Sequence, residues 1–181
     1  INNKITKKSI ESCFQKNNWS GCFANQEVGY YDIFALRADN WNSVDCFAEI
    51  YKDNINSFSY IQEDFQMDYL FEKHVLKKMR KIKKDSEWIE VNSAFGGIGI
   101  YKYEDIKNNF YDLTPSKSEY EYECEHVNFN NRIIENGGKL FINPGFINSK
   151  YNEHNKRLKK RFLYLDKLRR FNTLRKDPFN L

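Results

Sequence analysis

Short apolar segments of this chain alternate between helix-like and strand-like patterns, with no linker between them. The 181 residues include only three Pro and eight Gly, and no repeat or low-complexity stretch divides them. The patterns predict helices and strands in this order: helix 6–16, strands 20–25 and 30–36, helices 43–52 and 61–83, strands 88–91 and 97–103, a polar loop 111–121, helix 125–136 and strand 140–143. Such alternation favours an α/β fold, in which helices pack on a mixed sheet.

The ends of three predicted elements carry their own signals. The predicted helix 61–83 ends in a Lys-rich run, which suits the negative C-terminus of a helix. The helix 125–136 is followed by Gly137 and Gly138, a typical stop for a helix. The last predicted strand is closed by Pro144 and Gly145.

The positive charge of the chain is concentrated in residues 156–176. This segment holds ten Lys or Arg residues and one acid, Asp166, so it carries +9; the whole chain is +4, so the rest carries −5. Apolar residues follow one another there at helical spacing, namely Leu158, Phe162, Leu165 and Leu168. A basic amphipathic helix can lie on an anionic membrane or contact nucleic acid. It can equally close the domain, with its apolar stripe packed and its charges in water.

Several classes of protein are excluded by what the sequence lacks. Four Cys residues without CxxC spacing argue against a zinc ribbon or a disulfide scaffold, and we expect free thiols. Three His residues without an HExxH pattern exclude a zincin signature. No apolar run approaches 18 residues and the first residues form no signal peptide. The chain begins with Ile rather than Met, so we expect it to be a piece of a longer protein.

An apolar segment, residues 30–37, carries Asp32 near one end and Arg37 at the other. Burying either charge without a partner would be costly, so each is expected to face a partner or a ligand site. A structural ion pair is the alternative to a functional role.

A glycine-rich segment, residues 91–101, reads VNSAFGGIGIY. Its three glycines within four positions would let the backbone approach a ligand closely. The same glycines suit a β-bulge or a tight bend. The segment is neither a dinucleotide-binding fingerprint nor a phosphate-binding loop of the Walker type.

Glu125 and His126 open the predicted helix 125–136. Acids are stabilised at a helix N-terminus, so a cap is one interpretation. A carboxylate beside an imidazole is also a candidate acid–base or metal-binding unit. His154, near the basic segment, is either a surface residue or a ligand.

The segment ECEHVNFNNRIIENGGKLFINP resembles the end of the catalytic region in GT-A glycosyltransferases. In that family an acidic motif opens a helix, an Arg follows in it, a Gly ends it and a strand comes next. Glu125-His126, Arg132 and Gly137-Gly138 occupy these places here. VNSAFGGIGIYKYEDI is similar to the Gly-rich strand on the acceptor side of the same fold. GCFANQEVGYYDIFALR adds a similarity to microbial, viral and fungal sugar transferases of the capsule α-mannosyltransferase type, and the resemblance covers about residues 9–148.

The resemblance implies a GT-A-like mixed α/β sheet that lacks part of its N-terminal nucleotide-binding half, because the chain has no Asp-x-Asp. Residues 1–155 would be the acceptor-side catalytic region and 156–181 a basic C-terminal helix. The implied activity is metal-dependent hexosyl transfer from a nucleotide-diphosphate sugar to a hydroxyl of a glycan or glycolipid, with Mn²⁺ or Mg²⁺. The implied roles are catalysis by Glu125 and Asp32, a metal ligand at His154, and substrate binding by Arg37, Ser93, Phe95, Gly96, Gly97 and His126.

Other functions are open from the sequence. A carbohydrate-binding fragment without turnover would use the same residues. A nucleic-acid-binding module would use the basic segment, but the rest of the chain is acidic and has no nucleic-acid-binding motif, so the leading interpretation includes no nucleic acid. We expect a cytoplasmic protein whose residues 156–176 contact a membrane surface.

Overall fold

A computed structural model describes residues 5–56, 63–112, 123–150 and 154 of the chain. The basic segment 156–176 and most of the predicted loop 111–121 therefore lie outside the described residues. Within the described ranges, no helix is long and apolar enough to cross a membrane. All four cysteines are buried free thiols, as expected.

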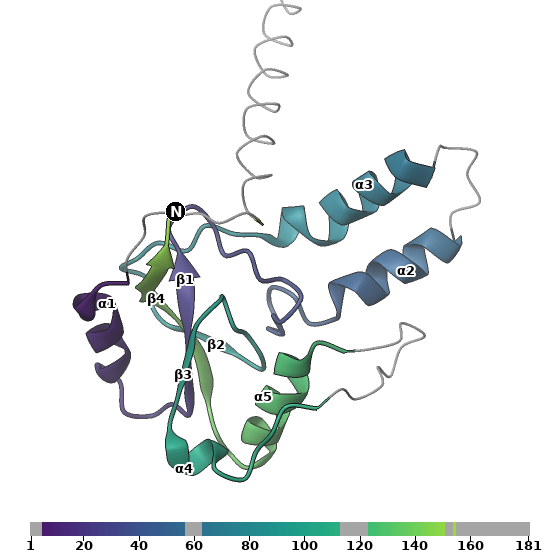
Figure 1. The fold of residues 1–181 in the computed structure, drawn as a ribbon. Helices are drawn as coiled ribbons and strands as arrows, with labels where there is room; N and C mark the ends of the chain where they lie inside the picture. Colours follow the sequence, from purple (N-terminus) through teal and green to yellow (C-terminus); the bar gives the residue numbers. More distant parts are fainter. Residues whose placement is uncertain (1–4, 57–62, 113–122, 151–153, 155–181) are drawn as a thin grey trace, which may run out of the picture.

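A mixed four-stranded sheet forms the centre of the fold, with the order β2-β4-β1-β3 (Figure 1). The strands are β1 (Gly21–Gln26), β2 (Ile89–Val91), β3 (Gly99–Tyr101) and β4 (Leu140–Ser149). The two central strands, β1 and β4, are parallel, with Gly21 opposite Leu140. Each edge strand is antiparallel to its neighbour. The expected α/β class with a mixed sheet and flanking helices is thus confirmed.

The helices lie around this sheet in two groups. The turns α1 (Lys7–Glu11) and η1 (Ser12–Phe14) pack on one side, and α5 (Glu125–Glu135) packs on the other (Figure 1). The helices α2 (Cys46–Asn56) and α3 (Glu63–His74) form an antiparallel hairpin beside the sheet, followed by η2 (Leu76–Lys78). A short helix that the sequence did not predict, α4 (Tyr103–Ile106), follows β3.

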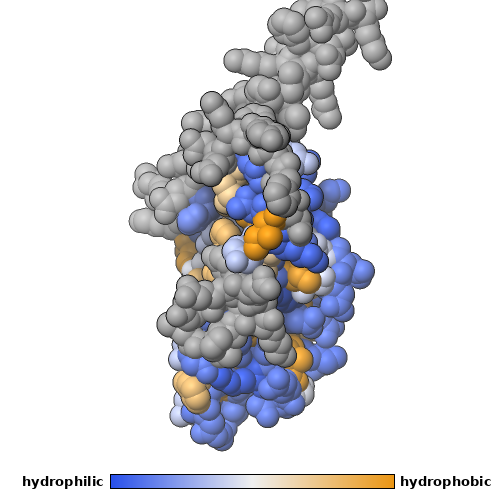
Figure 2. Space-filling model, turned by 90° about the vertical axis from the view of Figure 1, so that its right-hand side faces the viewer, coloured by the Kyte–Doolittle hydropathy of each residue, from blue (hydrophilic) through white to orange (hydrophobic). Residues whose placement is uncertain are grey.

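The central strand β1 is buried on both faces, as expected of a strand covered by helices on each side. Cys22 and Ala24 face a smaller cluster with Cys13, Trp19 and Phe146. Phe23 faces the larger core, whose other fully buried members include Tyr30, Ile33, Leu36, Ile133, Leu140 and Ile142. The outer surface is mostly hydrophilic on the hairpin side, where hydrophobic atoms form small separate groups (Figure 2).

The predicted strand 30–36 is wrong, because this segment is a series of turns. The Ile33 amide donates to the Tyr31 carbonyl, and the Leu36 amide donates to the Ile33 carbonyl. The side chain of Asn42 donates to the carbonyls of Ile33 and Leu36, at 3.0 and 2.8 Å. These carbonyls are satisfied by one buried amide rather than by a neighbouring strand, so the apolar residues are buried without joining the sheet.

The predicted helix 61–83 is too long, and the predicted strand 140–143 is too short. After His74 and the turn η2, residues 79–83 belong to no helix or strand. Their backbone is bound to the core instead: the Arg80 carbonyl accepts from the Tyr30 amide at 2.8 Å. Strand β4 runs through Pro144 and Gly145 to Ser149. A register shift against β1 accommodates this pair, as expected for proline at a bulge.

Candidate functional site

A cavity of about 680 Å³ lies where the turns after Tyr30, the start of α5 and the base of the α2–α3 hairpin meet. It brings together several of the residues predicted from the sequence: Asp32, Phe95, Glu125, His126 and His154. The other lining residues are mostly apolar or aromatic: Tyr31, Ile33, Phe34, Cys46, Phe47, Phe71, Val75, Met79 and Cys124. An apolar wall with a few convergent polar groups is typical of a small-molecule site.

Asp32 is held by two backbone amides at the edge of this cavity. One carboxylate oxygen accepts from the Gly96 amide at 3.0 Å, and the other accepts from the Ala35 amide at 3.4 Å. Burial raises the pKa of Asp32, while the two amides and the imidazoles of His126 and His154 act in the opposite direction. The carboxylate is therefore fixed in position and more basic than an ordinary Asp.

His126 belongs to the first turn of α5, and its ring is stacked on Phe95, with the ring centroids 4.0 Å apart. The edge of Tyr111 meets it at 5.4 Å. Its Nδ1 is buried and has no hydrogen-bond partner in the described structure. Burial lowers the pKa of His126, although Glu125 and Asp32 act in the opposite direction. Burial thus favours the neutral imidazole, whose Nδ1 is out of reach of solvent.

Glu125 precedes His126 and is the more exposed of the two, with 48% of its side chain accessible. Its Oε1 lies 3.8 Å from His126 Nε2, beyond a hydrogen bond. Both residues line the cavity. Glu125 is therefore placed to meet a ligand at the cavity mouth rather than to orient the His126 ring.

The buried position of His126 predicts a pH-dependent loss of stability. Because the folded-state pKa of His126 is lowered, the unfolded chain binds more protons once the pH falls below the ordinary His range of about 6.5. We expect the free energy of unfolding to fall as the pH drops from 7 to 5, and less steeply in His126→Gln. Urea unfolding at several pH values measures both slopes, and equal slopes would contradict the expectation.

His154 lies on the cavity wall with its ring stacked on Tyr31, the centroids 5.3 Å apart. Burial and the charge of Asp32 raise the pKa of Tyr31 to about 12, so this phenol is neutral. In the described ranges, no group of three or more His, Cys, Asp or Glu side chains could hold a metal ion. The ligand set that the resemblance implies for Mn²⁺ or Mg²⁺ is therefore not provided by these residues.

Four of the predicted substrate-binding residues do not line the cavity, namely Arg37, Ser93, Gly96 and Gly97. Arg37 is buried, and its guanidinium lies 2.7 Å from Asp45 and 3.5 Å from Glu123. Ser93 is fully buried, and its Oγ accepts from the Asn130 side chain at 2.9 Å. The structure thus gives Arg37 the ion pair that was the alternative to a ligand-binding role.

The bend in the glycine-rich segment helps to position Asp32. Gly96 has a φ of +66°, and its carbonyl accepts from the side chains of Gln26 and Asn148. Gly97 has a φ of +87° and packs against Tyr31. Neither glycine lines the cavity. Their conformation matches the tight bend considered from the sequence, and this bend presents the Gly96 amide to Asp32.

Several lining residues were not predicted from the sequence. Cys124 stands within the acidic motif, and burial raises its pKa to about 12, so its thiol is neutral. Phe47 and Phe71 come from the hairpin helices, where nothing in the local sequence distinguishes them from core residues. Tyr31 could have been suggested by its position next to Asp32 in the sequence. Neighbouring residues of a strand point to opposite faces, but this segment turns, so both residues line the cavity.

Comparison of the chain with family models, with curated proteins and with solved structures finds no match.

Proposed function

We propose that this cavity binds the acceptor sugar in a glycosyl-transfer reaction and that Asp32 takes the proton from its reacting hydroxyl. The observation that carries the proposal is the placement of Asp32 and His126 on one cavity, with Asp32 held by the amides of Gly96 and Ala35. Burial raises the pKa of Asp32 and lowers that of His126, and both groups line the same cavity. Titratable groups tuned in this way mark acid–base sites.

The reaction follows from these positions. Asp32 accepts the hydroxyl proton while the acceptor oxygen attacks the anomeric carbon of the donor sugar. The new C–O bond forms as the bond to the leaving diphosphate breaks, and the diphosphate departs with the electron pair. Neutral His126 lines the cavity with Asp32 and adds no positive charge that would lower the basicity of the Asp32 carboxylate. Glu125, at the mouth, orients the acceptor.

The aromatic lining supports a carbohydrate as the ligand. Phe95 and Tyr31 line the cavity, each with one ring face stacked on a histidine. Aromatic rings complement the apolar face of a sugar ring, and the carboxylates complement its hydroxyls.

The charge of the cavity favours the acceptor over the donor. Among the described lining residues there is no Lys or Arg, whereas Asp32 and Glu125 are acidic. A nucleotide diphosphate would be repelled by these carboxylates, but a neutral sugar would not. The nucleotide-sugar donor therefore contributes only its sugar end here, and the cations for its diphosphate come from outside this lining.

The test is the turnover of single-residue variants. We expect Asp32→Asn to lower the rate of nucleoside diphosphate release by about 10²- to 10⁴-fold, the usual contribution of a general base. Glu125→Gln should cost less and act mainly on KM for the acceptor. Asp39→Asn, which changes an exposed carboxylate outside the cavity, is the control. A panel of nucleotide sugars and free sugars serves as substrates, and wild-type turnover that survives Asp32→Asn would refute the role of Asp32.

A carbohydrate-binding protein without turnover is the second candidate. The absence of cations and of a metal-ligand group from the described part of the cavity favours it. It predicts that sugars bind, as titration followed by NMR would show, while no donor is consumed. Asp32→Asn then weakens binding only modestly, because Asn keeps one acceptor oxygen.

The interpretations that rest on residues 156–176 stay predictions, because that segment lies outside the described residues. Membrane contact predicts that the full chain floats with anionic vesicles and that removal of residues 156–181 abolishes this. Nucleic-acid binding through the segment predicts an affinity that falls steeply with salt.

A further inference from the structure

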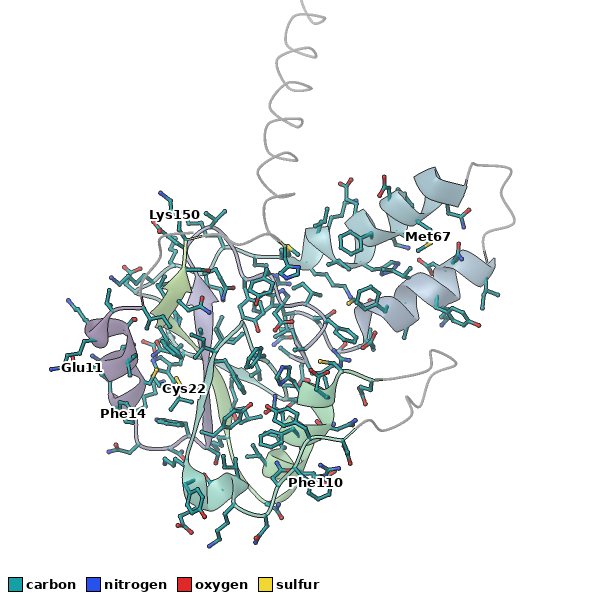
Figure 3. The ribbon with its side chains drawn as sticks, viewed as in Figure 1. Glu11, Phe14, Cys22, Met67, Phe110 and Lys150 are labelled. Carbon is teal, nitrogen blue, oxygen red and sulfur yellow. The ribbon has the colours of Figure 1, made fainter. Side chains whose placement is uncertain are left out.

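A second hollow, of about 720 Å³, lies between the α1–η1 turns, the segment after Ile82 and the end of β4. Figure 3 labels Lys150, a lining residue that directly follows β4. None of its lining residues lines the cavity described above. It is therefore a separate feature, and the proposed acid–base chemistry does not use it.

The charge of this hollow is strongly positive. Its lining includes four lysines, Lys8, Lys81, Lys84 and Lys150, and one acid, Glu27. All five side chains are exposed. The net charge of +3 contrasts with the acidic lining of the first cavity and points to an anionic ligand. We call this feature the basic hollow.

Buried amides hold the walls of the basic hollow together. Asn25 is fully buried, and its side chain donates to the carbonyls of Ile82 and Pro144, at 3.3 and 3.2 Å. Asn143, also buried, donates to the Ser12 hydroxyl at 2.9 Å. The lysine-bearing segment and the α1–η1 turns are thus both tied to β4. The lysines project from fixed walls, so part of the ordering cost of binding is met by the fold.

The uncharged lining residues indicate which anion fits. Hydroxyls and amides alternate with the lysines, contributed by Thr6, Ser9, Ser12, Gln15, Asn148 and Ser149. No aromatic ring is present among these lining residues. Single-stranded nucleic acids bind through aromatic stacking in addition to charge, so this lining does not suit their bases. Ammonium groups and hydroxyls without rings suit phosphate oxygens.

We propose that the basic hollow binds a small molecule carrying several phosphate groups. Lysines from opposite walls would each contact a different phosphate through charge-assisted hydrogen bonds. Both a free oligophosphate and the head group of a multiply phosphorylated lipid have this chemistry, and the experiment distinguishes them. The site does not depend on the function proposed for the first cavity.

The test is calorimetric titration of the full chain with tripolyphosphate at 50, 150 and 300 mM salt. Lys8 and Lys84 are the residues to change, because they lie on different walls of the basic hollow. We expect Lys8→Gln combined with Lys84→Gln to weaken binding at least tenfold at 150 mM salt. We expect Glu27→Gln to tighten binding two- to fivefold, since it removes the opposing charge. A merely damaged fold cannot produce this gain.

Lys77→Gln is the matched control, because Lys77 is exposed in the same basic run but does not line the basic hollow. Its affinity should stay within twofold of wild type. Equal losses in Lys77→Gln and in the double variant, or no tightening in Glu27→Gln, would overturn the proposal. So would tighter binding of a 15-nucleotide oligothymidine than of tripolyphosphate. If the protein sediments with vesicles that contain a phosphoinositide, and tripolyphosphate competes, the ligand is a lipid head group. If the protein does not sediment with these vesicles, the ligand is a free oligophosphate.

Discussion

Replacing Arg37 with Met is expected to lower the free energy of unfolding by about 3–5 kcal/mol, the usual cost of removing one partner from a buried ion pair. The Arg37 side chain is only 8% exposed, and Asp45 beside it is 10% exposed. Without the guanidinium, the Asp45 carboxylate would remain buried near Glu123 with no positive charge between them.

The damage would spread because Arg37 joins several parts of the fold. Its guanidinium also donates to the carbonyls of Phe34 and Leu36, both at 2.9 Å. Asp45 in turn accepts from the amides of Phe47 and Ala48, at 2.8 and 3.0 Å, and so caps the start of α2. Loss of the Arg37 side chain therefore removes the side-chain donor to the Phe34 carbonyl, leaves the Leu36 carbonyl with Asn42 alone, and weakens the attachment of the hairpin.

Urea unfolding followed by circular dichroism measures the effect, and Arg132→Met is the matched control. Arg132 pairs with Asp112, but both side chains are about one-third exposed. Its replacement is expected to cost about 1 kcal/mol or less, as for a surface pair. If Arg37→Met unfolds like wild type but loses sugar binding, Arg37 is a ligand-binding residue, as the resemblance implied, and the ion-pair explanation fails.

The sheet and its covering helices could be predicted because their signals are local. Helix α5 was located by its acidic start and by the glycines that end it, and β1 was recognised as a short strand from residues 20–25. Tyr30 to Leu36 has the same strand-like composition. Two of its carbonyls, those of Ile33 and Leu36, accept from the Asn42 side chain, a partner that no local pattern reveals.

Long-range backbone contacts also explain the misplaced element ends. The helical pattern of residues 61–83 continues past His74 in the sequence, but the chain leaves the helix there and its backbone binds Tyr30 and Asn25. Proline after Asn143 would end most strands. Here the Pro144 carbonyl finds a donor in Asn25, and β4 continues beyond it.

The charged residues of the candidate site could be predicted from the sequence, whereas most of its apolar and aromatic lining residues could not. Asp32 was identified because a charge buried in an apolar segment needs a partner or a ligand. The Glu125-His126 pair was identified because a carboxylate beside an imidazole opens a predicted helix. The sequence could not decide whether each charge forms a structural ion pair or faces a ligand site. Asp32 and Arg37 lie in the same segment, yet the turns send Asp32 to the cavity and Arg37 to Asp45.

Both the packing of the fold and the geometry of the site require that residue 96 has no Cβ. We therefore expect Gly96→Ala to lower the free energy of unfolding by about 3 kcal/mol. A Cβ at Gly96 would lie 2.4 Å from the carbonyl oxygen of Ala24, which belongs to the central strand and cannot move aside. Overpacking of this kind costs about 1–3 kcal/mol, and the positive φ adds about 1–2 kcal/mol for any residue with a Cβ.

Gly137→Ala separates the two causes, because Gly137 has a φ of +83° but no atom within 4 Å of an added Cβ. It should cost only about 1 kcal/mol, the conformational part alone. The excess in Gly96→Ala then measures the contact with β1. Relief of that contact must move the Gly96 amide, which holds Asp32 at 3.0 Å. We therefore expect the folded fraction of Gly96→Ala to lose sugar binding or turnover at least tenfold, whereas Gly137→Ala keeps both. Equal free energies of unfolding for the two variants would show that β1 yields to the methyl group and that the bend does not position Asp32.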